Sequence, residues 1–113
     1  MHVLVVEDEP LVARLTTRLL ASLGHTSDWV ASAEEALQRL AAEGYELVLC
    51  DRQLPGLSGT ALLATARERW PGLACVLVTG WGAQGELPGV VVLAKPFDRG
   101  ALQEAIARAR AVN

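Results

Sequence analysis

Short apolar runs alternate along the chain with stretches in which apolar residues recur at helical spacing. The apolar runs, which predict β-strands, are residues 3–6, 26–30, 47–50, 74–78 and 90–94. All except 26–30 are apolar at nearly every position, as in parallel strands that helices cover on both faces. The more polar run at 26–30 is typical of an edge strand. The alternation predicts an α/β fold with a single doubly wound, five-stranded parallel sheet.

The helical stretches have recognisable ends. Helices are predicted to begin at Pro10, after the capping residues Ser32 and Ser58, and after Asp98, and the first three to end near Gly24, Gly44 and Pro71. In the first, Leu11, Leu15, Leu19 and Leu23 form a stripe of the kind that faces a core, with Val12 and Leu20 beside it. Inward positions in the second and last helices are Ala36, Leu37 and Leu40, then Leu102, Ala105, Ile106 and Ala109.

The connection between the last two predicted strands breaks the alternation. Five of the ten residues at 80–89 are Gly or Pro, whereas a crossover between parallel strands needs about a dozen residues including its helix. We therefore expect helix four, the fourth of five regular helices, to be short or absent, with at most one turn around residues 83–87.

Length and charge narrow the functional classes. The 113 residues, 51% of them apolar, suffice for one core, so residues 1–113 are expected to form one domain. A net charge of −3 without a basic block argues against direct nucleic-acid binding. With no membrane-length apolar run and no signal-peptide pattern, we expect a cytoplasmic location. Cys50 and Cys75 lie in strand-like runs and are expected to be buried thiols.

Residues with useful chemistry follow the predicted strands. They are Glu7, Asp8 and Glu9 after the first, Asp51 after the third, Thr79 at the end of the fourth and Lys95 after the fifth. Ligands of open parallel sheets bind beyond the carboxyl ends of strands, where the strand order reverses. Converging carboxylates repel one another, and a hard cation such as Mg²⁺ relieves the repulsion. Singly, each residue is more often a cap, a turn hydroxyl or a solvated lysine, so it is their joint position that indicates a site.

Four separated motifs carry a resemblance to a known family. They are residues 3–10 (VLVVEDEP), 51–56 (DRQLPG) with Gly59, 79–80 (TG) and 95–97 (KPF). In this order and spacing they resemble response-regulator receiver domains over nearly the whole chain. The resemblance implies a flavodoxin-like sheet with strand order 2-1-3-4-5. It also implies a signalling switch, which assists its own phosphorylation and dephosphorylation but is not otherwise an enzyme.

The resemblance further assigns roles at the metal site. Asp51 would accept the phosphoryl group as an aspartyl phosphate. Asp8, Asp51 and the backbone carbonyl of Gln53 would bind Mg²⁺ directly, and Glu7 would act through a water molecule.

The remaining assignments concern the phosphoryl group and the partners. Lys95 would neutralise phosphoryl oxygens, and Thr79 would move to hydrogen-bond them. The Lys95–Pro96 peptide bond would be cis. The phosphodonor would be a histidine kinase or a histidine phosphotransfer protein, and an unidentified downstream protein would read the state. Neither nucleic acid nor membrane is expected as a partner.

Besides the short helix, two residues depart from the family pattern. Val92 stands where the family usually has an aromatic switch residue, and Trp81 follows Thr79 and Gly80 where a smaller or polar residue is usual. We expect Trp81 to cover core left bare by the short helix or, alternatively, to anchor a partner. Signalling through residues 79–95 is then expected to involve ordering of residues 80–89. Trp70 and Trp29 are expected to pack in the core and on the edge strand.

Two alternatives remain open. A Mg²⁺-dependent aspartyl phosphohydrolase of the haloacid-dehalogenase type would need a second Asp two residues after the nucleophile, where this chain has Gln53. A pseudo-receiver, an interaction module that no longer takes phosphate, fits the altered switch. It fits the intact set of acidic residues, Thr79 and Lys95 less well.

Overall fold

Five parallel strands form one sheet in the computed structural model, which describes residues 1–80 and 87–112. They are β1 (His2–Val6), β2 (Thr26–Val30), β3 (Leu47–Asp51), β4 (Ala74–Thr79) and β5 (Val90–Ala94). The order across the sheet is β2-β1-β3-β4-β5. The predicted strand order is confirmed, with β2 at one edge and a reversal of winding between β1 and β3.

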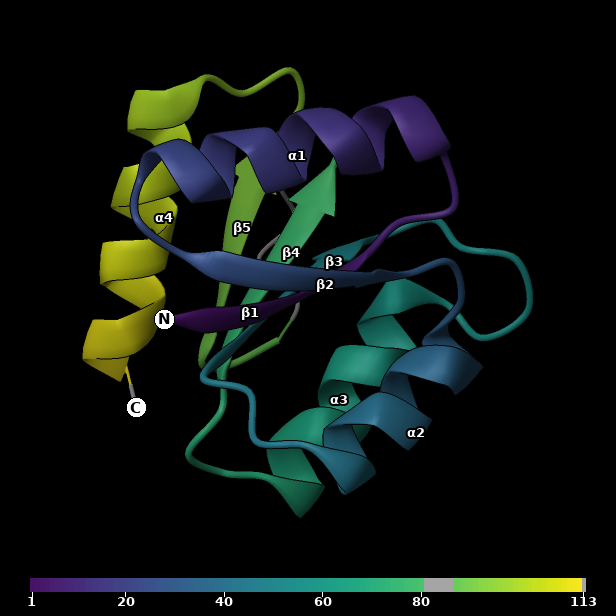
Figure 1. The fold of residues 1–113 in the computed structure, drawn as a ribbon. Helices are drawn as coiled ribbons and strands as arrows, with labels where there is room; N and C mark the ends of the chain where they lie inside the picture. Colours follow the sequence, from purple (N-terminus) through teal and green to yellow (C-terminus); the bar gives the residue numbers. More distant parts are fainter. Residues whose placement is uncertain (81–86, 113) are drawn as a thin grey trace.

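Helices cover both faces of the sheet. Helices α1 (Pro10–Ser22) and α4 (Arg99–Val112) lie on one face, and α2 (Ala33–Ala42) and α3 (Gly59–Arg69) lie on the other (Figure 1). Successive strand residues point to opposite faces, so Val3 and Val5 pack with α1 and α4, whereas Leu4 and Val6 pack with α2 and α3. A buried cluster therefore lies on each face of the sheet, which explains why the strands are apolar at nearly every position.

The predicted helix ends and inner faces agree with the structure except on α1. The Ser32 hydroxyl oxygen accepts the Glu35 N–H, and that of Ser58 accepts the Ala61 N–H. Gly24 follows α1 with φ +88°, a conformation that favours glycine. The predicted inward residues of α4 are all buried.

The leucine stripe predicted for α1 is wrong as a core-facing stripe. Leu11 and Leu15 are 73% and 61% exposed, whereas Ala13, Thr16 and Leu20 form the buried face. A step of four residues exceeds one helical turn by about 40°, so a stripe at this spacing winds around the helix. Its first two leucines therefore point away from the sheet and stay exposed.

The connection between β4 and β5 is only partly described. Residue 80 and residues 87–89 are not helical, and α4 is the C-terminal helix rather than the helix predicted to be short or absent. Trp81 and the rest of residues 81–86 lie outside the described residues, as do the expectations of a covering ring and an ordering segment. Residue 113 is also outside.

Other expectations on side chains and composition can be compared directly. Cys50 and Cys75 are buried free thiols, as predicted. Trp70 is half-buried against the α2–α3 cluster, so it reaches the core only in part. Trp29 is 42% exposed on β2. Among the described helices, none combines the length and the apolar character that crossing a membrane requires.

Candidate functional site

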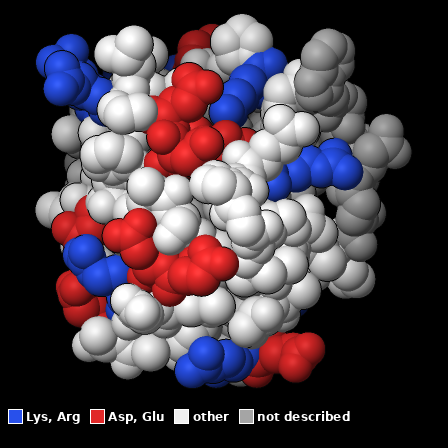
Figure 2. Space-filling model, turned by 90° about the vertical axis from the view of Figure 1, so that its right-hand side faces the viewer, with Lys and Arg blue, Asp and Glu red and all other residues white. Residues whose placement is uncertain are grey.

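Three carboxylates converge where β1 and β3 end. Glu7 and Asp8 follow β1 directly, Asp51 is the last residue of β3, and one oxygen of each lies within 4.8 Å of the other two. The strands are neighbours with Val6 opposite Cys50, so their next residues emerge side by side. Acidic side chains gather on the face that carries the loops after β1 and β3 (Figures 1 and 2).

Lys95 bridges two of these carboxylates. Its Nζ lies 2.9 Å from Asp51 Oδ2 and 3.5 Å from Glu7 Oε1. The Lys95–Pro96 bond is cis, as the resemblance implied. Lys95 N donates to the Thr79 carbonyl oxygen at 2.8 Å, which connects the ends of β4 and β5. The only lysine of the sequence is thus the counter-charge of the site.

Burial and charge shift the titration of this group. Glu7 is 4% exposed. Its burial, with a smaller contribution from the Asp51 charge, raises the pKa of the Glu7 carboxyl to about 7, against the Glu9 N–H and Lys95, which lower it. Burial works to lower the pKa of the Lys95 ammonium, but Asp51 and Glu7 outweigh it and raise that pKa. Burial and the Asp51 charge thus favour the protonated form of Glu7, and the two carboxylates favour the charged form of Lys95.

An open pocket of about 710 Å³ lies over these groups. Its lining contains the predicted residues Asp8, Asp51, Gln53, Thr79 and Lys95. Glu7 is not part of this lining and instead borders a small cavity that Asp51 also lines. The Gln53 N–H donates to Asp51 Oδ1 at 3.2 Å. Thr79 is 3% exposed at the end of β4. Of the other predicted switch residues, Gly80 lines this pocket, whereas Val92 is half-buried within β5 and absent from the lining.

Gly59 allows α3 to begin close to Asp51. A Cβ on Gly59 would overlap the carbonyl oxygen of Asp51, and the Gly59 N–H donates to the Arg52 carbonyl oxygen at 3.0 Å. The Arg52 N–H in turn donates to the Val78 carbonyl oxygen at 2.8 Å. The backbone around Asp51 is therefore held by β4 on one side and by the start of α3 on the other.

The donor set fits a magnesium ion. Mg²⁺ prefers oxygen ligands and is commonly held by one or two carboxylates, with water and phosphate oxygens completing its shell. Asp8 is exposed and Asp51 is 8% exposed, so a cation between them would face the open pocket. A cation would also relieve the repulsion from Asp51, which adds to the effect of burial in raising the pKa of Glu7.

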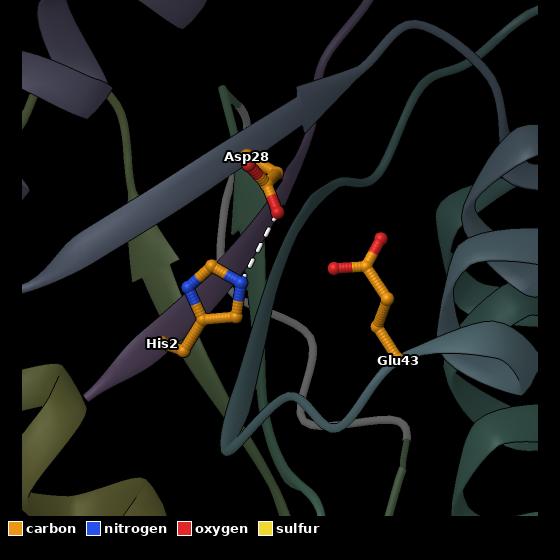
Figure 3. Close-up of side chains that lie close together, drawn as sticks. All are labelled: His2, Asp28 and Glu43. Carbon is orange, nitrogen blue, oxygen red and sulfur yellow. Dashed lines mark ion pairs between the residues drawn. The ribbon is translucent and has the colours of Figure 1, made fainter.

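A second group of possible ligands, which the sequence did not reveal, lies beside the edge strand. His2 Nε2 is 3.1 Å from Asp28 Oδ2, and Glu43 points toward them from the end of α2 (Figure 3). However, the Arg39 guanidinium lies 3.2 Å from Asp28 and 3.1 Å from Glu43. Tyr45 also donates to Asp28 at 2.7 Å. The Arg39 side chain already supplies the positive charge there, so we describe this group as an ion-pair network.

Comparison with known proteins identifies the family. The sequence profile of the response regulator receiver domain matches residues 3–107. The chain belongs to the response-regulator receiver family. It is 37% identical over 112 residues to the response regulator protein FleR of Pseudomonas aeruginosa, covering 94% of this chain and 24% of FleR. It is 34% identical to the transcriptional regulatory protein TcrA of Mycobacterium tuberculosis, covering 100% of this chain and 46% of TcrA.

A solved structure of a similar receiver domain contains the expected metal. It is the receiver domain of a sensor histidine kinase from Pseudomonas aeruginosa PAO1, with a magnesium ion coordinated in its active-site cleft. It is 28% identical, covers 97% of each chain and superposes with a TM-score of 0.85. Receiver domains are generally signalling switches rather than classical enzymes. This chain spans less than half of the length of FleR and of TcrA.

Proposed function

We propose that this receiver domain is a phosphorylation-dependent switch that accepts a phosphoryl group on Asp51 in a Mg²⁺-dependent reaction. The observation that supports this best is the surroundings of Asp51. The Asp51 side chain is 10% exposed, its carboxylate contacts the Lys95 ammonium at 2.9 Å, and it lines an open pocket together with Asp8. A nucleophilic carboxylate, a cation and a metal-binding partner thus share one accessible site.

The chemistry follows from these contacts. An oxygen of Asp51 attacks the phosphorus of a phosphohistidine, the new P–O bond forms as the P–N bond breaks, and the histidine nitrogen keeps the electron pair. Lys95 neutralises phosphoryl oxygens as the negative charge approaches Asp51. Asp8 and Asp51 would hold Mg²⁺, which would supply a second positive charge for the same oxygens. The Gln53 N–H and Lys95 hold the two Asp51 oxygens in place.

The proposed reaction is tested by phosphate uptake from acetyl phosphate, a small donor that needs no docking surface. The wild-type domain should become phosphorylated in the presence of Mg²⁺ and should lose that ability with a chelator. A domain that binds Mg²⁺ but takes up no phosphate under these conditions would instead be a pseudo-receiver.

A histidine kinase or phosphotransfer protein, as the phosphodonor, would dock on an apolar groove beside the site. The groove, of about 630 Å³, is lined by apolar residues of α1 and of the segment after β5, among them Leu15, Leu19 and Phe97. Gly80 and Lys95 line both this groove and the Asp51 pocket. Leu11, exposed on the same helix one turn before Leu15, extends the apolar surface. A donor protein seated there would bring its phosphohistidine to Asp51.

Substituting a charged residue into the groove distinguishes an effect on docking of the donor protein from an effect on the phosphorylation reaction. Leu15→Asp should slow phosphotransfer from a histidine-phosphorylated donor protein about tenfold or more, as for a central apolar contact, and leave uptake from acetyl phosphate unchanged. Val112→Asp is the matched control, because Val112 is 51% exposed on α4 and outside the groove. Equal transfer to Leu15→Asp and to wild-type protein would remove the groove from the proposal.

Output would pass through residues 79–95. Thr79 ends β4 beside Asp51, and its carbonyl oxygen accepts the Lys95 N–H at 2.8 Å. A movement of Thr79 toward the phosphoryl group would therefore be transmitted to the end of β5. Amide exchange in β5, measured with and without Mg²⁺ and beryllofluoride, tests this. Protection should rise in wild-type protein but not in Thr79→Ala, and equal changes in both would contradict the proposed route.

A further inference from the structure

Trp29 contacts the segment that bears two of the site's carboxylates. The indole Nε1–H donates to the backbone carbonyl oxygen of Glu7 at 2.6 Å. Trp29 lies on β2 opposite Val5 of β1, so its side chain reaches along β1 to the residue just beyond the strand. Trp29 is 42% exposed, so it buries only part of its surface while its indole N–H is hydrogen-bonded.

With this contact, both the N–H and the carbonyl oxygen of Glu7 are hydrogen-bonded to β2. The Glu7 N–H donates to the Val30 carbonyl oxygen at 3.1 Å, and the Glu7 carbonyl oxygen accepts the Trp29 indole N–H. Both partners belong to the end of β2. The Glu7 carboxylate also accepts the Glu9 N–H at 3.2 Å. The edge strand, which carries none of the predicted site residues, thus fixes the backbone on which Asp8 stands.

Peptide planarity carries this constraint to Asp8. The Glu7 carbonyl oxygen and the Asp8 nitrogen belong to one planar unit, so holding the oxygen also sets the orientation of the Asp8 nitrogen. Asp8 is exposed, and the direction of its side chain depends strongly on that backbone. A rotation of this peptide would turn the Asp8 carboxylate away from Asp51.

We propose that Trp29 is a positioning residue of the magnesium site. Its indole N–H holds the Glu7–Asp8 peptide so that the Asp8 carboxylate faces Asp51. This inference rests on the proposed Mg²⁺-dependent function and assigns to the edge strand a part in it.

Comparing the Mg²⁺ affinity of variant and wild-type domains tests the role of the indole N–H. Trp29→Phe keeps an aromatic ring and removes the donor, and the loss of one hydrogen bond should weaken Mg²⁺ binding by about threefold to tenfold in titration calorimetry. Trp70→Phe is the matched control: Trp70 packs beside Arg69 at the end of α3, its ring centroid 4.6 Å from the guanidinium, and should leave the affinity unchanged.

A spectroscopic readout keeps the test decisive if Trp29→Phe folds poorly. In ¹H–¹⁵N spectra of the wild-type domain, Mg²⁺ should shift the Trp29 indole N–H resonance and leave that of Trp70 in place, and in Asp8→Asn the midpoint of this shift should move to about tenfold higher Mg²⁺ concentration. An unchanged Mg²⁺ affinity in folded Trp29→Phe, even with a lower melting temperature, would overturn the inference alone, as would an unshifted indole resonance. A wild-type domain that binds no Mg²⁺ would overturn the proposed function as well.

Discussion

Replacing Lys95 by Met should destabilise the metal-free domain in a pH-dependent way. The substitution keeps an apolar stem of similar length and removes the charge that lies 2.9 Å from Asp51 and 3.5 Å from Glu7. The side chains of Asp51 and Glu7, which are 10% and 6% exposed, would then face each other without their counter-charge. Asp8, the third carboxylate of the group, adds to the repulsion.

The size of the effect follows from burial. Removing one partner of a fully buried ion pair costs about 3–5 kcal/mol. The Lys95 side chain is 28% exposed, so solvent screens part of the charge and we expect a loss of about 1–3 kcal/mol at pH 8. At pH 5 the Glu7 carboxyl, with its pKa of about 7, is protonated in the folded domain. Only Asp51 then loses its counter-charge within the pair, and the loss should be about half as large.

Urea unfolding of wild-type protein, Lys95→Met and Lys95→Arg at both pH values is the assay. The Arg variant keeps the positive charge and should lose less stability at pH 8 than the Met variant. Saturating Mg²⁺ at pH 8 should narrow the difference between wild type and Lys95→Met. Equal losses at pH 5 and pH 8 would show that packing of the lysine stem, and not its charge, stabilises the site.

Three further predictions concern the metal, the pH and the backbone. Asp8→Asn should weaken Mg²⁺ binding about tenfold, and Glu7→Gln should weaken it less because Glu7 would act through a water molecule. Unchanged Mg²⁺ affinity in Asp8→Asn would exclude Asp8 as a ligand. Without Mg²⁺, the free energy of unfolding should fall as the pH rises from about 4.5 to 7, because in this range Glu7 keeps its proton in the folded domain and releases it in the unfolded chain. A free energy of unfolding that does not change with pH in chemical denaturation would contradict this. Gly59→Ala should lower the melting temperature and slow phosphorylation, because its Cβ would overlap the Asp51 carbonyl oxygen, whereas Gly72→Ala, with open space around it, should do neither.

The sheet and the convergence of the site were predictable from local sequence. Four apolar runs of strand length require coverage on both faces, which restricts the fold to a parallel sheet between helices. The carboxyl ends of parallel strands lie at one edge, so residues that directly follow them must meet whatever path the loops take. Glu7, Asp8, Asp51, Thr79 and Lys95 all follow or end strands, and their approach needed no knowledge of side-chain conformation.

Features that depend on side-chain reach were not predictable in this way. The α1 leucines recur every four residues, and only the docked helix shows that Leu11 and Leu15 point away from the sheet. The Trp29 contact depends on an indole ring that reaches past the end of β1 to the Glu7 carbonyl oxygen. The network of His2, Asp28 and Glu43 joins residues from three elements, and no spacing in the sequence connects them.

Chemical mapping of the phosphorylated residue tests the central claim most directly. The domain is phosphorylated with acetyl phosphate and Mg²⁺, and borohydride reduction then converts an aspartyl phosphate into homoserine, which mass spectrometry locates in the peptides. Homoserine should appear at residue 51 and nowhere else, and Asp51→Asn should yield none. Homoserine at Asp8 or another carboxylate, or undiminished labelling of Asp51→Asn, would contradict the account.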